Sequence, residues 1–193
     1  DVEIDADLVD RLRARPVCLS PTLMREVSTF VYETTPPFFG DPFFIKYADA
    51  TWVAALRNPE TQEKTRNSAS AARYKAALEV AKRNVKKLAD EGLPIAMGTD
   101  TGPVGRFPGY FELMELELMV QAGLTPRQAL LSATRDAARC LDLASDLGTI
   151  EVGKWADFVV LHADPLTQIS NVRAIDSVYI AGNPVNRSPG LRP

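Results

Sequence analysis

Apolar residues recur through the first 141 positions mainly with the three-to-four-residue spacing of amphipathic helices. The clearest case is residues 68–90, where we expect one buried face and a helix end at Gly92. The positions predicted to form that face are Ala72, Ala76, Val80, Val85 and Leu88. Shorter stretches with the same spacing predict helices at 5–14, 46–57 and 111–121.

A further helix is predicted to begin at Thr125, because a threonine followed by a proline is a common N-cap and first helical residue. Its inner face is expected to be small and apolar. The positions on that face are Ala129, Leu130, Ala133, Ala137 and Leu141.

Two short apolar runs, at residues 16–23 and 93–100, suit buried strands better than helices. Each run is followed by a loop and helices, which is the order of βα units in a parallel sheet. Chemistry in such sheets gathers at the C-terminal ends of the strands. Asp100 stands directly after the second run and before a loop rich in glycine and proline. It is therefore a candidate metal ligand or general base, with a turn-forming aspartate as the alternative.

Residues 34–45 combine three prolines, Gly40 and four phenylalanines. The prolines and the glycine predict no regular element. The phenylalanines need apolar surroundings, so we expect either a loop pinned onto the domain or an aromatic wall over a pocket. In the second case Phe39 and Phe43 are candidate substrate contacts.

The pattern changes at Gly148, after which short apolar runs predict strands at 157–161 and 172–181. Gly182 and Asn183 predict a hairpin-like turn. We therefore expect a helix-rich part over residues 1–147, a strand-rich part over 148–187, and a frayed tail at 188–193.

Composition and charge exclude several classes of protein. The 193 residues carry a net charge of −3 and a pI near 5.3, which argues against a nucleic-acid partner. No apolar run is long enough to span a membrane, and the acidic N-terminus does not resemble a signal peptide, so we expect a cytoplasmic protein.

Cys18 and Cys140 lie far apart among apolar neighbours, so they are predicted to be free buried thiols. A disulfide or a catalytic thiol is possible but has no local support.

Several segments taken together resemble a known family. They are GLPIAMGTDTG, AGLTPRQALLSATRDAARCL and LGTIEVGKWADFVVL, within a stretch from about Leu93 to Asn186. This stretch resembles the C-terminal portion of metal-dependent amidohydrolases of the imidazolonepropionase-like and prolidase-type group. The resemblance implies an α/β fold: the last two βα units of a (β/α)8 barrel, followed by strands of a small β-sandwich.

The resemblance also implies a chemistry. Asp100 matches the aspartate of the eighth barrel strand, which in that family binds metal and takes a proton from the attacking water. The metal implied is divalent, with zinc as the first choice. The family's other ligands are mainly histidines, and none matches here, because His162 falls beyond the barrel part. The residues expected to face a substrate around Asp100 are Thr99, Thr101, Gly102 and Arg106.

The sequence thus predicts part of a hydrolase that cleaves amide, cyclic amide or peptide-like C–N bonds through a metal-activated water. The substrate would be a small molecule or resemble a dipeptide. The remaining ligands and the N-terminal part of the barrel would lie outside this chain, and we expect a homo-oligomer. The alternative is an incomplete, non-catalytic fragment or assembly module. A small α/β binding domain of another family rests on chain length alone.

Overall fold

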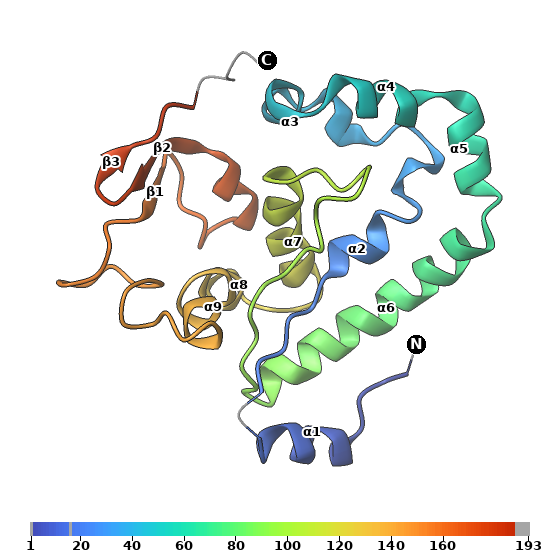
Figure 1. Ribbon diagram of the computed structural model, residues 1–193. Coiled ribbons are helices and arrows are strands. Elements are labelled where there is room, and N and C mark those ends of the chain that lie inside the picture. The colour runs from blue at the N-terminus through green and yellow to red at the C-terminus, as the bar shows by residue number, and fades with distance from the viewer. Residues whose placement is uncertain (1, 16, 188–193) are drawn as a thin grey trace.

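The computed structural model describes residues 2–15 and 17–187. The long helix α6 runs along one side, α7 lies in the middle, and a small sheet lies at the opposite edge (Figure 1). The helices are α1 (Ala6–Arg13), α2 (Leu23–Val27), α3 (Pro42–Tyr47), α4 (Ala50–Arg57), α5 (Pro59–Arg66), α6 (Ala69–Asp90), α7 (Tyr110–Gln121), α8 (Pro126–Ala133) and α9 (Arg135–Cys140). The 3-10 helices and strands are η1 (Val31–Glu33), η2 (Pro37–Gly40), η3 (Ile169–Arg173), β1 (Phe158–Leu161), β2 (Ile175–Ile180) and β3 (Asn183–Pro184).

The two predicted barrel strands lie side by side and run parallel, but their pairing is short. Leu19 and Ile95 form a parallel bridge, with Leu19 N–H donating to Pro94 O at 3.1 Å. Leu19 O in turn accepts from Ala96 N–H at 2.9 Å. Beyond this point the first segment turns into α2 at Leu23, so the strand predicted at 16–23 is shorter than expected. Pro16 lies outside the described residues.

The helix predicted at 68–90 is confirmed as α6, but part of its predicted buried face is wrong. Val85 and Leu88 are buried, whereas Ala72 and Ala76 are exposed. The buried alanines of its first half are Ala71 and Ala77. Alanine occupies so many positions here that periodicity alone could not choose a face. Packing against α2 makes the choice.

The aromatic segment is more regular than predicted. Residues 37–40 form η2, and Asp41 then caps α3 by accepting the Phe43 N–H at 2.8 Å. Phe39 and Phe44 are only 1% and 2% exposed, and their rings stack with centroids 5.2 Å apart. The segment is therefore anchored in the core by its own rings.

The helix predicted at 46–57 is divided in two, because Asp49 caps a new helix, α4. Its side chain accepts N–H groups from Thr51 and Trp52. The next helix, α5, begins at Pro59 after an Asn58 cap and was not predicted.

The helix predicted from Thr125 begins there, with a capping box in which Thr125 and Gln128 satisfy each other's backbone N–H. It does not continue to Leu141, because the backbone breaks at Thr134 between α8 and α9. Leu141 follows α9 and is 68% exposed, so its predicted place on an inner face is wrong.

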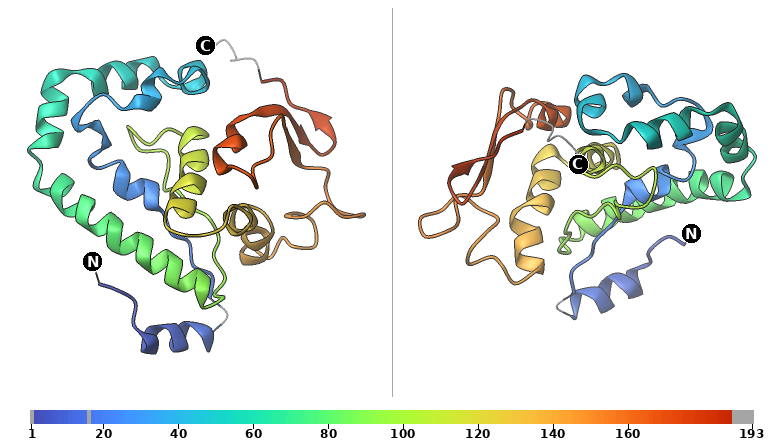
Figure 2. Two further views of the ribbon diagram at one scale, coloured as in Figure 1. Left: turned by 180° about the vertical axis from the view of Figure 1, so that it is seen from behind. Right: turned by 45° about the horizontal axis from the view of Figure 1, so that its top comes forward.

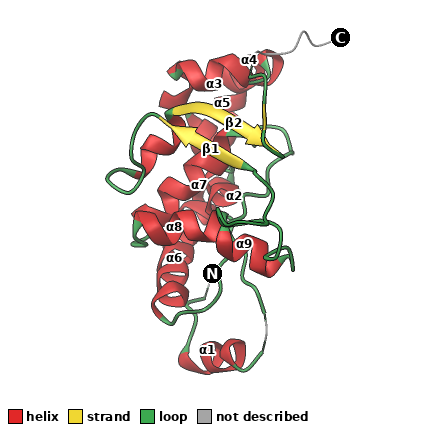
Figure 3. Ribbon diagram, turned by 90° about the vertical axis from the view of Figure 1, so that its left-hand side faces the viewer, coloured by secondary structure: helices red, strands yellow, loops and turns green. Residues whose placement is uncertain are grey.

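The strand-rich part forms one antiparallel sheet in the order β1-β2-β3. Figure 2 shows the sheet beside the helices from behind and with the top of the molecule turned forward, and Figure 3 shows β1 and β2 in front of the helices. Phe158 on β1 pairs with Tyr179 on β2, and their rings stack at 4.6 Å. The hairpin turn lies at Ala181 and Gly182, one residue earlier than predicted. Among the described residues this sheet is a single layer; no second layer completes a sandwich.

Cys18 and Cys140 are joined in a disulfide, so the prediction of two free thiols is wrong. Their Cα atoms lie 5.6 Å apart, although 122 positions separate them in the sequence. The first parallel strand segment carries Cys18 and α9 ends with Cys140, and folding brings these two segments together. The separation of the two cysteines along the sequence did not indicate that they are in contact.

Candidate active site

Asp100 lies at the C-terminal end of the second parallel segment, as predicted. Its backbone has a φ of 55°, in the left-handed region that aspartate and asparagine tolerate better than most residues. The carboxylate is 56% exposed and faces the loop that follows. The chain therefore ends a buried segment in a sharp turn that presents a carboxylate to solvent.

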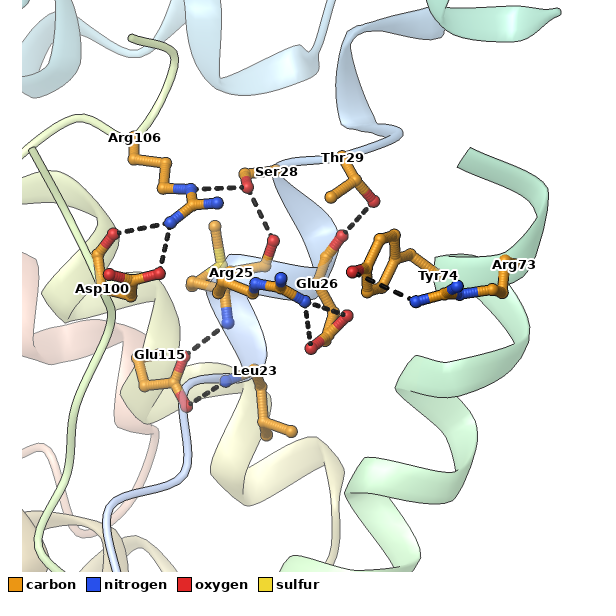
Figure 4. A network of polar contacts seen from close by, with 11 residues as sticks. Leu23, Arg25, Glu26, Ser28, Thr29, Arg73, Tyr74, Asp100, Arg106 and Glu115 are labelled. Carbon is orange, nitrogen blue, oxygen red and sulfur yellow. Dashed lines mark hydrogen bonds and ion pairs between the residues drawn. The ribbon is translucent and has the colours of Figure 1, made fainter. Parts of the chain in front are cut away.

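The Asp100 carboxylate is paired with Arg106, which follows it by six residues in the sequence. Its guanidinium forms an ion pair with the Asp100 carboxylate, and Nη1 also donates to the Asp100 carbonyl at 3.1 Å (Figure 4). Nε donates to Ser28 Oγ at 3.1 Å, at the end of α2. Arg106 is only 18% exposed and spans the two segments that follow the parallel strands.

Thr99 and Thr101 point to Glu112 on α7. Both hydroxyls donate to Glu112 Oε1, at 2.8 Å and 2.6 Å. The other oxygen, Oε2, accepts the Gly109 N–H at 2.6 Å. Glu112 thus joins both ends of the loop after Asp100. In the structure the two threonine hydroxyls are hydrogen-bonded to Glu112. Their predicted contact with a substrate stays a prediction.

Glu115, one turn further along α7, was missed by sequence reasoning. It is fully buried, and its two oxygens accept the N–H groups of Leu23 at 2.9 Å and Met24 at 2.6 Å. Burial raises the pKa of this carboxyl to about 8, against the effect of the two N–H bonds, and the charge of Glu112 raises it further. Glu115 fixes the start of α2, whose other end holds Arg106 through Ser28 (Figure 4).

An aromatic cavity of about 560 Å³ lies beside the end of the same loop. Its lining includes Phe43, Trp52, Phe107 and Tyr110. Phe39 lies behind it in the core, in edge-to-face contact with Phe107. The structure therefore brings Phe43 and the Asp100 loop to a common region, while Phe39 supports the wall from inside.

The remaining candidate residues lie as follows. Gly102 is exposed with a φ of 117°, and an added Cβ would meet nothing within 4 Å. Its backbone serves the turn between Asp100 and Arg106, since its N–H donates to Arg106 O at 3.2 Å. His162 follows β1 and lies 3.2 Å from Asp176, in the sheet and away from this loop.

Asp100 alone does not make a metal site. Within residues 2–15 and 17–187, no three histidine, cysteine, aspartate or glutamate side chains are grouped so that they could hold a metal ion. The charge partner of Asp100 is instead Arg106. The described residues thus do not fit a complete metal centre, and no reaction step through a metal follows from them.

Comparison with known proteins gives the family. The profile of the amidohydrolase family matches residues 44–185, which is most of the chain. The chain belongs to the amidohydrolase family. This confirms the resemblance indicated by the sequence motifs. The second strand segment and Asp100 lie within the matched residues.

Curated relatives of this amidohydrolase chain are imidazolonepropionases. That of Christiangramia forsetii is 33% identical over 101 residues, covering 50% of this chain and 25% of the relative. That of Deinococcus deserti is 40% identical over 79 residues, covering 40% of this chain and 19% of the relative. The chain thus spans a quarter or less of the length of these relatives.

Solved structures resemble the amidohydrolase chain over nearly its whole length. A candidate prolidase from Bifidobacterium longum has a TM-score of 0.64 at 28% identity, covering 98% of this chain and 42% of that chain. Molinate hydrolase has a TM-score of 0.64 at 20% identity, covering 100% of this chain and 38% of that chain, and supports the fold alone. No helix in the described part of the chain is long and apolar enough to cross a membrane.

Proposed function

We propose that this chain contributes to a hydrolase that cleaves amide, cyclic amide or peptide-like C–N bonds in a small-molecule or dipeptide-like substrate. The observation that carries the proposal is the position of Asp100 at the C-terminal end of a parallel strand segment, with its carboxylate exposed and paired to Arg106. Active sites of barrel folds lie at that end of the strands. The proposal also assigns the strand pair to the last two βα units of the barrel.

The role proposed for Asp100 is that of a proton acceptor. Water attacks the carbonyl carbon, a C–O bond forms, and the proton of the water passes to the carboxylate. The same proton is then delivered to the leaving nitrogen as the C–N bond breaks. Arg106 pairs with the Asp100 carboxylate and donates to its backbone carbonyl, so it holds the residue in place before the attack. Glu112 holds the loop that carries both residues through Thr99 and Thr101.

The complete hydrolase is proposed to use a divalent metal ion, with zinc as the first choice and Asp100 as the ligand from this chain. The other ligands and the N-terminal part of the barrel would come from outside it, in an assembly that we expect to be a homo-oligomer. The alternative is a chain without catalysis of its own. It is favoured because no group of three side chains that could hold a metal ion occurs among the described residues. Elemental analysis separates the two: stoichiometric metal lost in Asp100→Ala supports the first, and no bound metal supports the second.

The exchange of Asp100 for asparagine tests the proton-acceptor role. Asparagine keeps the size of the side chain and tolerates the left-handed backbone, but it cannot accept the proton. We expect Asp100→Asn to lower kcat/KM on a panel of N-acyl amino acids, dipeptides and cyclic amides by about a thousandfold, or ~4 kcal/mol.

Asp142→Asn is the matched control, because Asp142 is also an exposed aspartate with positive φ, at 58°. Its activity should equal that of the unchanged protein. Full activity in Asp100→Asn would remove Asp100 from the reaction.

The aromatic cavity is proposed to receive an apolar or aromatic group of the substrate. Phe43 lines it directly, and Phe107 and Tyr110 belong to the segment that follows Arg106. The residues that surround Asp100 stay proposed as substrate-facing, namely Thr99, Thr101, Gly102 and Arg106. Phe39 is proposed to support the cavity wall through its contact with Phe107.

We propose a cytoplasmic location for the protein. The Cys18–Cys140 disulfide provides a way to test it. Disulfides persist mainly in oxidising compartments and are rare in the reducing cytosol. Alkylation of the protein at the moment of cell lysis, followed by mass measurement, would reveal whether Cys18 and Cys140 are reduced in the cell. Reduced thiols would fit the cytoplasmic proposal, and an intact disulfide would contradict it.

A further inference from the structure

We propose that the Cys18–Cys140 disulfide is a thiol–disulfide exchange site, and that the cavity beside it takes small thiols that carry carboxylate groups. This inference is independent of the hydrolase function, because it concerns the opposite end of the parallel strand pair from Asp100. It rests on the accessibility of the sulfur atoms, on the charges around them, and on the shape of the cavity.

The disulfide is open to attack. Cys18 is exposed, Cys140 is half-buried, and both line a cavity of about 420 Å³. The floor of this cavity is apolar, formed by residues that include Leu93, Ile95 and Leu131. Exchange requires a thiolate to reach one sulfur of the bond, so access limits the reaction of buried disulfides. Here a small thiol has room to enter beside the bond.

The charges on the cavity wall favour an anion. Arg127, Arg135 and Arg139 all line it, and Asp136 is the one carboxylate among the lining residues. Asp136 pairs with Arg135 at 2.8 Å and with Arg139 at 3.3 Å. Among the described residues, the Arg127 side chain has no hydrogen-bond or ion-pair partner, and the residue is exposed. Three guanidinium groups against one carboxylate leave an excess of two positive charges, and Arg127 is free to bind a carboxylate.

The exchange step can be written with all atoms balanced. The thiolate of the ligand attacks the sulfur of Cys18, the more exposed of the two residues, a mixed disulfide forms, and the bond to Cys140 breaks. Cys140 leaves as a thiolate, which the nearby guanidinium groups stabilise, and it then takes a proton from water. A second molecule of the same thiol attacks the ligand sulfur, which frees Cys18 and yields the oxidised dimer of the ligand. Two electrons pass from the two thiols to the protein disulfide.

Opening the bond would loosen the strand pair. Cys18 precedes Leu19, whose backbone forms the parallel bridge to Ile95. The disulfide ties this short bridge to the end of α9. A thiol that occupies the cavity would therefore control how firmly the first strand segment is held.

The test compares three thiols on the purified, oxidised protein at low ionic strength. Reduced glutathione carries carboxylates, 2-mercaptoethanol is neutral, and cysteamine is cationic. The rate of opening is measured by acid quench and intact mass, and each rate is divided by the rate of the same thiol on bis(2-hydroxyethyl) disulfide. We expect glutathione to exceed cysteamine by about tenfold, because charge steering typically changes encounter rates by this factor or more. In ~1 M salt the preference should nearly vanish.

Variants locate the effect. Arg127→Ala/Arg139→Ala should reduce the glutathione preference to near one. The matched control Lys46→Ala/Lys64→Ala removes two exposed positive charges outside the cavity lining and should retain the preference. Equal normalised rates for the three thiols would overturn the proposal, as would an unchanged preference in the arginine variant. The salt series on the unchanged protein decides the matter even if the arginine variant does not fold.

Discussion

Glu115 shows how one side chain can link distant parts of this fold. It leaves α7 inside the core and accepts the first two N–H groups of α2, Leu23 and Met24, which a helix cannot satisfy by itself. The carboxylate is fully buried, so desolvation disfavours its charge, and its pKa rises to about 8. Folding thus takes up a proton on Glu115 between pH 4.5 and about 8.

This linkage predicts a pH-dependent stability. Because the pKa is raised in the folded state, the stabilising effect of protonated Glu115 is complete below about 4.5 and is lost as the pH rises through about 8. Unfolding in urea from pH 5 to 8 should therefore show the unchanged protein losing stability relative to Glu115→Gln, by at most ~1.4 kcal/mol per pH unit. Glu63→Gln, at an exposed position, is the control. The difference in unfolding free energy between this variant and the unchanged protein should stay constant over the same pH range. A constant difference for Glu115→Gln as well would mean that its pKa is ordinary.

Phe43 offers a test of the aromatic cavity. It lines the cavity, whereas Ile45 on the same helix is exposed and lies outside its lining. Phe43→Ala should raise KM for substrates with an aromatic or large apolar group by about tenfold, while Ile45→Ala should leave KM unchanged. If Phe43→Ala preserves the order of preference among substrates, the cavity does not bind them.

At the scale of single residues, the sequence could indicate Asp100 but not its partners. Asp100 ends a short apolar run, which is a local signal. Its contact with Arg106 depends on a loop in which Gly102 and Gly105 have positive φ angles of 117° and 82°. The path of such a loop is set by tertiary contacts, including Tyr32 donating to the Gly105 carbonyl at 2.5 Å. Local periodicity contains none of this information.

The elements were predicted best where the ends carry their own signals. Thr125 followed by Pro126 was predicted to begin a helix and Gly92 to end α6, and both predictions are confirmed. The division of residues 46–57 at Asp49 was missed, since aspartate is tolerated within a helix as well as at its start. The two parallel strand segments were predicted from their apolar runs, but their pairing in the described residues is limited to the bridge between Leu19 and Ile95.

The turn that follows α9 gives a prediction at the scale of elements. Gly148 has a φ of 91°, and an added Cβ would lie 2.6 Å from the Ala138 Cβ and 3.0 Å from the Thr134 carbonyl oxygen. Gly148→Ala combines backbone strain with this overlap and should lower the free energy of unfolding by about 3 kcal/mol. Urea unfolding measures the change.

Gly153→Ala is the control for the backbone alone, because its φ is 92° and nothing lies within 4 Å of an added Cβ. It should cost about 1 kcal/mol. Equal losses in the two variants would show that the neighbours of Gly148 move aside, and the close packing of α9 on this turn would not be needed for stability.

At the scale of the whole molecule, the disulfide joins the first strand segment to the last helix before the sheet. Closing a loop of this length restricts the unfolded chain and typically stabilises a protein by about 2–4 kcal/mol. Cys18→Ser/Cys140→Ser should lower the unfolding free energy by that amount in urea. The unchanged protein, measured after complete reduction, should match the variant. A difference near zero would mean that the contact adds little to the packing around it.

The whole architecture could be predicted only in part, because the described residues contain one short parallel bridge, whereas a barrel pairs eight strands. The motifs indicated the family, and the family profile confirms it. The disulfide had no local signal, since Cys18 and Cys140 are 122 positions apart. Its existence depends on how α9 returns to the first strand segment.

The same bond changes the topology of the chain. With residues 18 and 140 linked, the main chain between them is a covalent ring that contains α2 to α9, and the segments before and after it are two tails. A protease that cuts once in the ring, for example in the exposed helix α5, opens the ring without releasing a piece. Electrophoresis without reductant would show a nicked molecule at its full mass, and reduction would separate it into two fragments. Damage to the main chain between these cysteines is therefore concealed while the bond is intact.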